Sequence, residues 1–231
     1  MRISGEEDAT VMAKAPETDK LREPLTRGRI LATALAIVDR DGLEDLSMRR
    51  LASELGVSAM SLYNHVPNKD ALLEGITEKL LSEINLGAIE TRDWADGLKT
   101  GFRLFRRLLL EHPNALPCIE NKPVVTPDAF RPIELSLSLL VQAGFSPPDA
   151  MFAHWTLVGY TLGHVSFQVN NPMGNPKDAE ELMIMKLQRL PREEFPNLTA
   201  ALPHTIGRDF NEAFEFGLET VVAGLKAKLA G

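Results

Sequence analysis

The sequence has little of what secreted, metal-binding and membrane-embedded proteins require. Its 231 residues include one cysteine, Cys118, which excludes a disulfide framework within the chain and is typical of a protein kept in a reducing cytoplasm. Its Cys and His residues form no cluster at metal-ligand spacing, so we expect no metal and no other cofactor. No window supplies the ~18 uninterrupted apolar residues of a spanning helix, and we expect no membrane partner.

The first residues also lack the apolar segment of a signal peptide. Residues 1–24 mix acidic residues with alanine, proline and threonine, and we expect them to form a disordered extension. The chain does have enough apolar material for a core, since 44% of its residues are hydrophobic and 25% are charged. Its net charge is −7, yet residues 27–69 carry six basic and five acidic side chains, so the acidity lies elsewhere.

Hydrophobic spacing predicts an all-α fold. Apolar residues recur three and four positions apart almost throughout, and few windows alternate with period two. N-cap residues and the breakers glycine and proline then set the expected ends of each helix. These signals predict helices from Thr26 to Gly42, at 48–55 and 59–65, from Asn68 toward Asn85, and at 94–111, 127–143, 148–169 and 206–229. We expect a proline-bearing connection at 113–127 and a polar loop at 170–178.

Residues 47–65 have the pattern of a helix-turn-helix, in which two helices are joined by a short turn and the second lies in the DNA major groove. Gly56 supplies the turn conformation that a Cβ would penalise. Ala52 is small where the two helices would approach, and Val57 and Leu62 would hold the second helix on the first. The remaining residues of the second helix would face outward, with Ala59 among them.

The outward side chains predict two kinds of contact with DNA. Ser61, Asn64 and His65 would contact base edges, and Ala59 and Met60 would contact thymine methyls. The group that would hold phosphates consists of Ser47, Arg49, Tyr63 and Lys69.

With its flanking residues, this segment resembles the Tet repressor (TetR) family of bacterial transcription regulators. The residues that carry the resemblance are "LSMRRLASELGVSAMSLYNHVPNKDALL" at 46–73, preceded by "GRILATALAIVDRDGLEDL". Shorter pieces resemble the tetracycline-repressor subgroup: "FRRLLLEHPN", "QAGFSPPDA", "TLGHV" and "FEFGLETVVAGLKAKL". The resemblance implies a homodimer with a three-helix DNA-binding domain at 25–70 and a larger helical effector-binding and dimerisation domain at 71–231.

The resemblance also carries over individual residues. The family's phosphate and base contacts fall on Ser47, Arg49, Ser61, Tyr63, His65 and Lys69. The chain has Ala59 and Met60 where tetracycline repressors place glutamine and proline, and Asn64 where they place tryptophan. We therefore expect a different operator.

A second departure concerns the inducer. Tetracycline repressors hold a drug–magnesium complex with two histidines and an asparagine, and this chain has Asn85, Gly101 and Ile119 at those positions. Ile119 cannot ligate a metal, and Gly101 has no side chain to bond the drug, so we do not expect induction by tetracycline and magnesium.

Apolar and aromatic residues of the larger domain predict an effector cavity with a few polar points, which favours a mostly hydrophobic or aromatic ligand. Its candidate lining is Asn85, Phe102, Phe105, Ile119, Phe130, Ile133, Ser136, Met151, His154, Trp155 and Val158. Residues of these types are also typical of an ordinary core, and their spacing leaves that alternative open.

Two helices of the larger domain are candidates for the dimer interface. Gly159 and Gly163 permit close helix approach, and the last helix is apolar over more than one face, so we expect a four-helix bundle across a twofold axis. The candidate interface residues are Gly159, Gly163, Phe214, Leu218, Val221 and Leu225. Packing within one subunit would also explain the glycine pair.

These patterns predict a ligand-responsive transcription regulator, a repressor that a small, largely apolar effector releases from a palindromic operator. Two alternatives belong to other classes. One is a helical hydrolase or lyase that uses His112, His154 or Asp149, although no complete catalytic set is evident. The other is a small-molecule binding or scaffold protein that has lost DNA binding.

Overall fold

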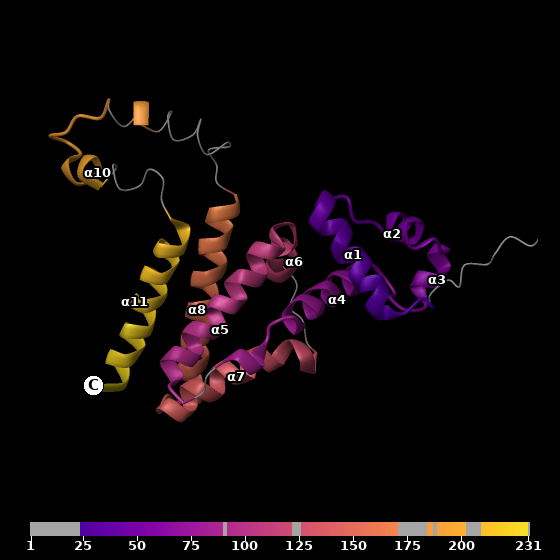
Figure 1. The fold of residues 1–231 in the computed structure, drawn as a ribbon, viewed down its shortest axis with the longest axis horizontal. Coiled ribbons are helices and arrows are strands. Elements are labelled where there is room, and N and C mark those ends of the chain that lie inside the picture. The colour runs from indigo at the N-terminus through magenta and orange to yellow at the C-terminus, as the bar shows by residue number, and fades with distance from the viewer. Residues whose placement is uncertain are drawn as a thin grey trace, which may run out of the picture.

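The computed structural model of the chain describes residues 24–89, 92–121, 126–170, 184–186, 189–201 and 209–230. Within these ranges every regular element is a helix and none is a strand (Figure 1), which confirms the all-α prediction. No helix among these residues is long and apolar enough to cross a membrane. The predicted extension at 1–24 and polar loop at 170–178 fall, except for their boundary residues 24 and 170, outside the described residues.

Three short helices form one end of the molecule, which we call the head (Figure 1). They are α1 (Arg27–Asp41), α2 (Met48–Leu55) and α3 (Ala59–Tyr63). Each begins at its predicted N-cap: the side chains of Thr26, Ser47 and Ser58 each accept a backbone N–H bond in the first turn. Such caps are each worth ~1 kcal/mol. α3 ends two residues earlier than predicted, at Tyr63.

Helix α4 (Lys69–Ser82) runs from the head into the rest of the molecule (Figure 1). Its buried face contains Leu72, Ile76 and Leu80, all fully covered. The head's apolar core continues past α4 to Leu108 and Cys118 of the larger domain, so head and larger domain share one cluster. α4 ends before the predicted Asn85, and a single 3₁₀ turn, η1 (Leu86–Ala88), follows.

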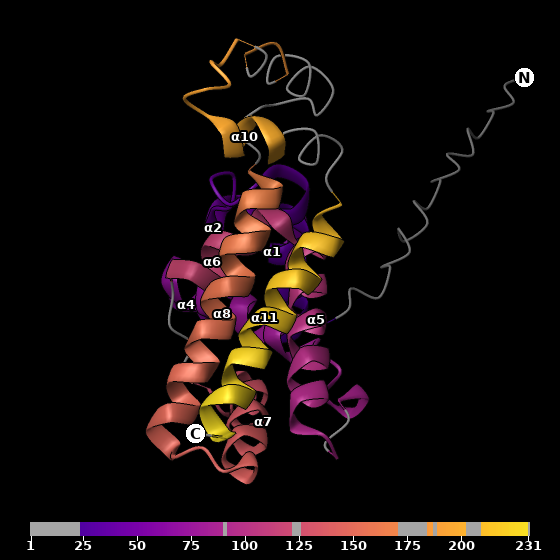
Figure 2. The ribbon, with the colours of Figure 1, turned by 90° about the vertical axis from the view of Figure 1, so that its left-hand side faces the viewer.

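The larger domain is a bundle whose longest helices are α5 (Trp94–Glu111), α7 (Pro127–Ala143), α8 (Pro147–Val169) and α11 (Phe210–Ala230). α5 packs against α7, α8 and α11. α8 and α11 lie side by side along one face (Figure 2). The second apolar core, around Phe102, Leu140 and Leu157, lies between these helices.

Two short segments of the larger domain are helical where no helix was predicted. The connection at 113–127 contains η2 (Pro113–Ala115) and α6 (Leu116–Asn121), and α10 (Pro196–Ala201) precedes the last helix. Pro113 and Pro117 stand in the first turn of their helices, where no intrahelical N–H bond is lost. Pro113 therefore follows the end of α5, as predicted, and also starts η2, while Pro117 lies in the first turn of α6.

Candidate DNA-binding surface and effector cavity

The turn between α2 and α3 has the conformation that its glycine predicts. Gly56 is left-handed, with φ of 66° and ψ of 33°. The N–H of Val57 donates to the Ala52 carbonyl over 3.0 Å, which closes the end of α2. Leu62, on the inner side of α3, is fully buried. These contacts fix α3 on the head as a helix-turn-helix.

The outer side of α3 and the segment after it are open to solvent. Met60 is 72% exposed and Tyr63 is 45% exposed, while Asn64, His65 and Lys69 are also exposed. Ser61 and Ser47 have a second role, because their oxygens take part in helix caps: the Ser61 hydroxyl lies 2.9 Å from that of Ser58, and Ser47 caps α2. Ser61 is half-buried, which makes it less accessible than its neighbours.

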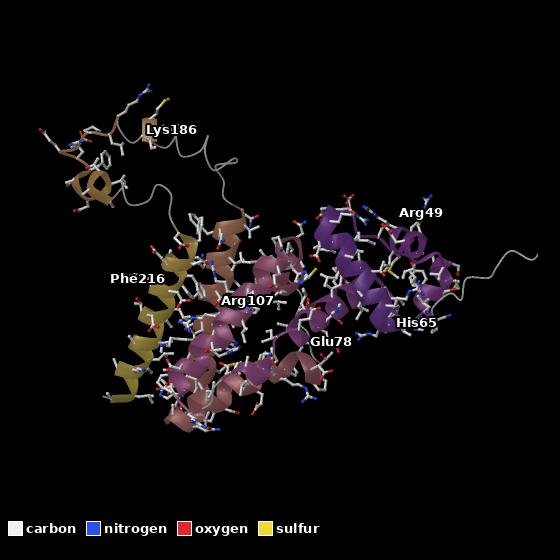
Figure 3. The ribbon with its side chains drawn as sticks, viewed as in Figure 1. Arg49, His65, Glu78, Arg107, Lys186 and Phe216 are labelled. Atoms are coloured by element: carbon white, nitrogen blue, oxygen red, sulfur yellow. The ribbon has the colours of Figure 1, made fainter. Side chains whose placement is uncertain are left out.

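Among the described residues, two cations of the predicted DNA-binding set have no carboxylate partner. Arg40 and Arg50 form ion pairs with Asp41, and further pairs with Glu54 and Asp45. Arg49 and Lys69 form no ion pair within the described part of the chain. Arg49 and His65 both lie at the head end (Figure 3), so cationic and polar groups gather where a duplex would approach.

A cavity of about 280 Å³ lies in the larger domain, between the end of α4 and helices α5, α6, α7 and α8. Eight predicted residues line it: Phe102, Phe105, Ile119, Ile133, Ser136, His154, Trp155 and Val158. Apart from the side chains of Ser136 and His154, the wall is almost wholly apolar, so it favours an apolar or aromatic ligand.

One polar pair stands in this apolar wall. Nδ1 of His154 lies 3.0 Å from the Ser136 hydroxyl, and both side chains are buried. Burial lowers the pKa of His154 to about 4, because a low-dielectric site disfavours the charged imidazolium. His154 is therefore neutral near pH 7, and the pair can orient a polar group of a ligand without adding charge.

Three predicted lining residues are wrong. Asn85 is exposed before η1, Phe130 is 43% exposed on α7, and Met151 is half-buried on α8, and none lines the cavity. The α7 face toward the cavity contains Pro132, Ile133 and Ser136, and Phe130 lies off that face. Gly101, which the resemblance placed at an inducer position, also lines the cavity. Residues that sequence reasoning missed are Leu81, Ile84, Leu86, Ile89, Gly97, Leu98, Ala129, Pro132, Leu135 and Leu139. Helical spacing from Ser136 would have found Ala129, Pro132 and Leu139.

The candidate dimer face divides into two groups. A Cβ at Gly159 or Gly163 would meet nothing within 4 Å in the described part of the chain, so packing within one subunit does not explain these glycines. Phe214 and Leu218 are instead wrong as interface residues, because each is at most 1% exposed in the protomer's own core. Val221 and Leu225 are half-buried and remain a prediction.

Large apolar side chains flank the two glycines on the outer side of the bundle. Phe152, Trp155 and Phe167 of α8 are each more than half exposed. Phe216 of α11 is 77% exposed (Figure 3). An apolar face of this extent is typical of a surface that another protein chain covers.

The three residues considered for catalysis have separate partners. His112 contacts Asp39, His154 contacts Ser136, and Asp149 accepts a bond from Ser146 at the start of α8. No group of three or more His, Cys, Asp and Glu residues in the described ranges could hold a metal ion. The buried Cys118 has a pKa raised to about 11 by desolvation, which keeps it an unreactive thiol.

A helix-turn-helix head joined to a helical bundle with an apolar cavity defines a DNA-binding regulator that responds to a ligand. Two family models match the chain: "Bacterial regulatory proteins, tetR family" at residues 30–76 and "Tetracyclin repressor-like, C-terminal domain" at 86–229. The chain belongs to the TetR family.

Individual relatives agree with this assignment. An HTH-type transcriptional regulator of Saccharopolyspora erythraea is 30% identical over 92% of this chain and 89% of the relative. The transcriptional repressor DrrR1 of Streptomyces coeruleorubidus is 31% identical over 89% of this chain and 79% of the relative. The crystal structure of Streptomyces coelicolor ActR in complex with actinorhodin is 32% identical, with a TM-score of 0.81 over 90% of this chain and all of that chain.

Proposed function

We propose that the protein is a dimeric repressor that binds a palindromic operator and leaves it when a small, largely apolar aromatic effector fills the cavity. The observation that carries this proposal is the position of the cavity, because Leu81 and Ile84 at the end of the α4 segment form part of its wall. α4 is also the helix that extends from the head, so one element joins the two candidate sites.

On the DNA side, the two α3 helices of a dimer would enter successive major grooves, ~34–36 Å apart. Met60, Asn64 and His65 would contact bases, with Ser61 making a smaller contribution because its hydroxyl serves the α3 cap. Arg49, Tyr63 and Lys69 would hold phosphates, Lys69 at the N-terminus of α4, where free backbone N–H groups also favour an anion. The domain division at 25–70 and 71–231, and a cytoplasmic location beside the operator, belong to the same proposal.

On the effector side, the cavity supports a flat, uncharged ligand that buries apolar rings against Phe102 and Phe105. One carbonyl or hydroxyl group of the ligand would face the neutral pair of His154 and Ser136. The structure of ActR with actinorhodin shows that a relative binds a ligand. We infer that this chain also binds a small molecule, since its own lining is suited to aromatic rings.

The transmission step rests on two side chains that touch both regions. Ile84 and Ile119 line the cavity and also pack against the apolar cluster of the head. A ligand that displaces them would favour a different angle of α4, and the two heads would leave the spacing that the operator requires. Operator and effector then oppose one another by the same coupling free energy in both directions.

A two-stage experiment tests the proposal. Polycyclic aromatic compounds are first screened for compounds that raise the melting temperature, and each hit is then added to a gel shift on duplexes from around the protein's own gene. We expect a stabilising compound to release the duplex. Binding of compounds without binding of any duplex above a shuffled control would favour the alternative module that has lost DNA binding.

A further inference from the structure

A polar cluster joins the head to the larger domain at the C-terminal end of α1. Nδ1 of His112 lies 2.9 and 3.0 Å from the two carboxylate oxygens of Asp39. The side-chain amide of Asn114 donates to the backbone carbonyl of Asp39 over 2.9 Å. Asp39 belongs to the head, whereas His112 ends α5 and Asn114 lies in η2. We call these three residues the latch.

The chemistry of the latch fixes which atom donates. An ionised carboxylate has no proton to give, so the imidazole donates through Nδ1–H to Asp39. Bonds of this charge-assisted kind are shorter and stronger than neutral ones. The latch is also sheltered, since the side chain of His112 is 18% exposed and that of Asp39 is 32% exposed.

The two acids near His112 lie at the C-terminal ends of their helices. Asp39 stands in the last turn of α1, and Glu83 is the C-cap of α4, and a negative charge at a helix C-terminus is disfavoured by the helix dipole. Oε2 of Glu83 lies 3.7 Å from Nε2 of His112, and Glu83 also holds Lys79. Two unfavourably placed carboxylates therefore converge on one histidine at the junction.

Glu83, which faces the latch, is adjacent in sequence to the wall of the effector cavity. Glu83, beside His112, is followed directly by Ile84, which lines the cavity. The latch is also tied to the head's core, because Ala115 directly follows Asn114 and is fully buried in the head's apolar cluster. A displacement of the cavity wall at Ile84 would therefore act on the same turn that faces the latch.

We infer that Asp39, His112 and Asn114 are positioning residues that fix the angle of each head on the bundle, and thereby the half-site spacing that the dimer accepts. This inference rests on the proposed operator binding. The latch does not touch DNA, so its loss leaves the contacts of a single head with a half-site unchanged. It instead lets the two heads of a dimer adopt a wider range of separations.

The test compares duplexes that differ only in the distance between two half-sites, selected beforehand from a random library. The variants are Asp39→Ala, Asn114→Ala and the two combined, because both side chains are at least partly exposed and their truncation spares the core. The control is Glu78→Ala, which breaks the ion pair with Arg27 between α1 and α4. The measured quantity is the ratio of Kd on a duplex lengthened by one base pair to Kd on the optimal duplex.

We expect the ratio of Kd on the lengthened duplex to Kd on the optimal duplex to fall about five-fold in the double variant. A change of this size corresponds to the loss of one or two net hydrogen bonds. Binding to an isolated half-site should stay within about two-fold of wild type, since a change at or below RT ln 2 is the size of ordinary surface substitutions. The control variant should keep the ratio of the wild type. An unchanged ratio in the double variant, or an equal loss of affinity on all duplexes, overturns the inference.

A second measurement does not depend on DNA. Spin labels at Ser53 on α2 and Gln142 on α7, both exposed, report the distance from head to bundle within one protomer. The distance distribution should broaden in the double latch variant and not in Glu78→Ala. If wild type binds no duplex but the distribution broadens, the proposed function fails and the latch stands; an unchanged distribution contradicts the latch.

Discussion

At the scale of single residues, the candidate DNA surface separates affinity from sequence preference. Lys69 would pair with a phosphate, which every duplex carries. The Asn64 amide would instead bond to base edges, whose donors and acceptors differ with sequence. Both side chains are exposed, so their truncation should leave the fold intact.

The division of roles predicts different outcomes for two substitutions. Lys69→Ala should weaken binding to all duplexes by a similar factor and lower the salt dependence. Asn64→Ala should change which duplex is preferred, by ~1–3 kcal/mol if a good base contact is lost. Fluorescence anisotropy on a set of point-mutated operators measures both. Equal losses from the two variants on every duplex would refute the division.

His154 predicts a pH dependence of stability. Its pKa is lowered by burial from 6.5 to about 4, so between these values the unfolded chain binds more protons than the folded chain. The free energy of unfolding then falls as the pH falls through this window. From pH 7 to pH 5, His154 should account for a loss of about 2 kcal/mol.

Urea unfolding at the two pH values checks this expectation. His154→Gln keeps a polar side chain beside Ser136 but does not titrate in this range, so its stability should fall by about 2 kcal/mol less than that of wild type. If both proteins lose the same stability between pH 7 and pH 5, His154 is not the group responsible.

At the scale of elements, local signals predicted where helices begin and end better than what their faces contact. Ser47, Ser58 and Asn68 cap the helices assigned to them, because a cap depends on residues within one turn. Pro113 misled the prediction, since a proline that breaks one helix also starts the next. Phe214 was predicted at the dimer interface but packs inside the protomer. Periodicity identifies which face of a helix is apolar, but it does not identify what that face packs against.

Two glycines on neighbouring helices predict opposite failures. A Cβ at Gly217 of α11 would overlap the Tyr160 ring, whose hydroxyl donates to the Phe214 carbonyl. A Cβ at Gly159 of α8 meets nothing in the described protomer. Gly217→Ala should therefore lower the protomer's stability by ~1–3 kcal/mol, whereas Gly159→Leu should act on dimerisation.

Sedimentation velocity and thermal unfolding together separate these outcomes. Gly159→Leu should shift the protein toward monomer at concentrations where wild type is dimeric, with its helical content retained. Gly217→Ala should melt at a lower temperature. A dimer of unchanged stability in Gly159→Leu would remove this glycine from the interface.

At the scale of the whole molecule, the cavity and the DNA surface lie in regions that share apolar packing. Ile84 and Ile119 contact both the cavity and the core of the head. The resemblance predicted the two regions, and the apolar pattern predicted eight of the nineteen residues that line the cavity. Neither predicted the latch, because Asp39 and His112 are 73 positions apart and only the folded arrangement of α1, α4 and α5 brings them together.

In the proposed function, the same arrangement makes effector binding and operator binding opposing equilibria. An effector can move the operator equilibrium only as far as its affinities for the two head positions differ. The effector affinity of the operator complex should therefore be lower than that of the free protein, by the same factor as the effector weakens operator binding.

The most direct measurement of the central claim is the stoichiometry and specificity of DNA binding. Wild-type protein is titrated into a labelled palindromic duplex at moderate salt, with competition by a shuffled duplex, and the mass of the complex is determined. We predict two protomers on each palindrome, with binding that a half-site duplex and the shuffled competitor do not match. Equal binding to palindromic and shuffled duplexes, or no binding to either, would contradict the account.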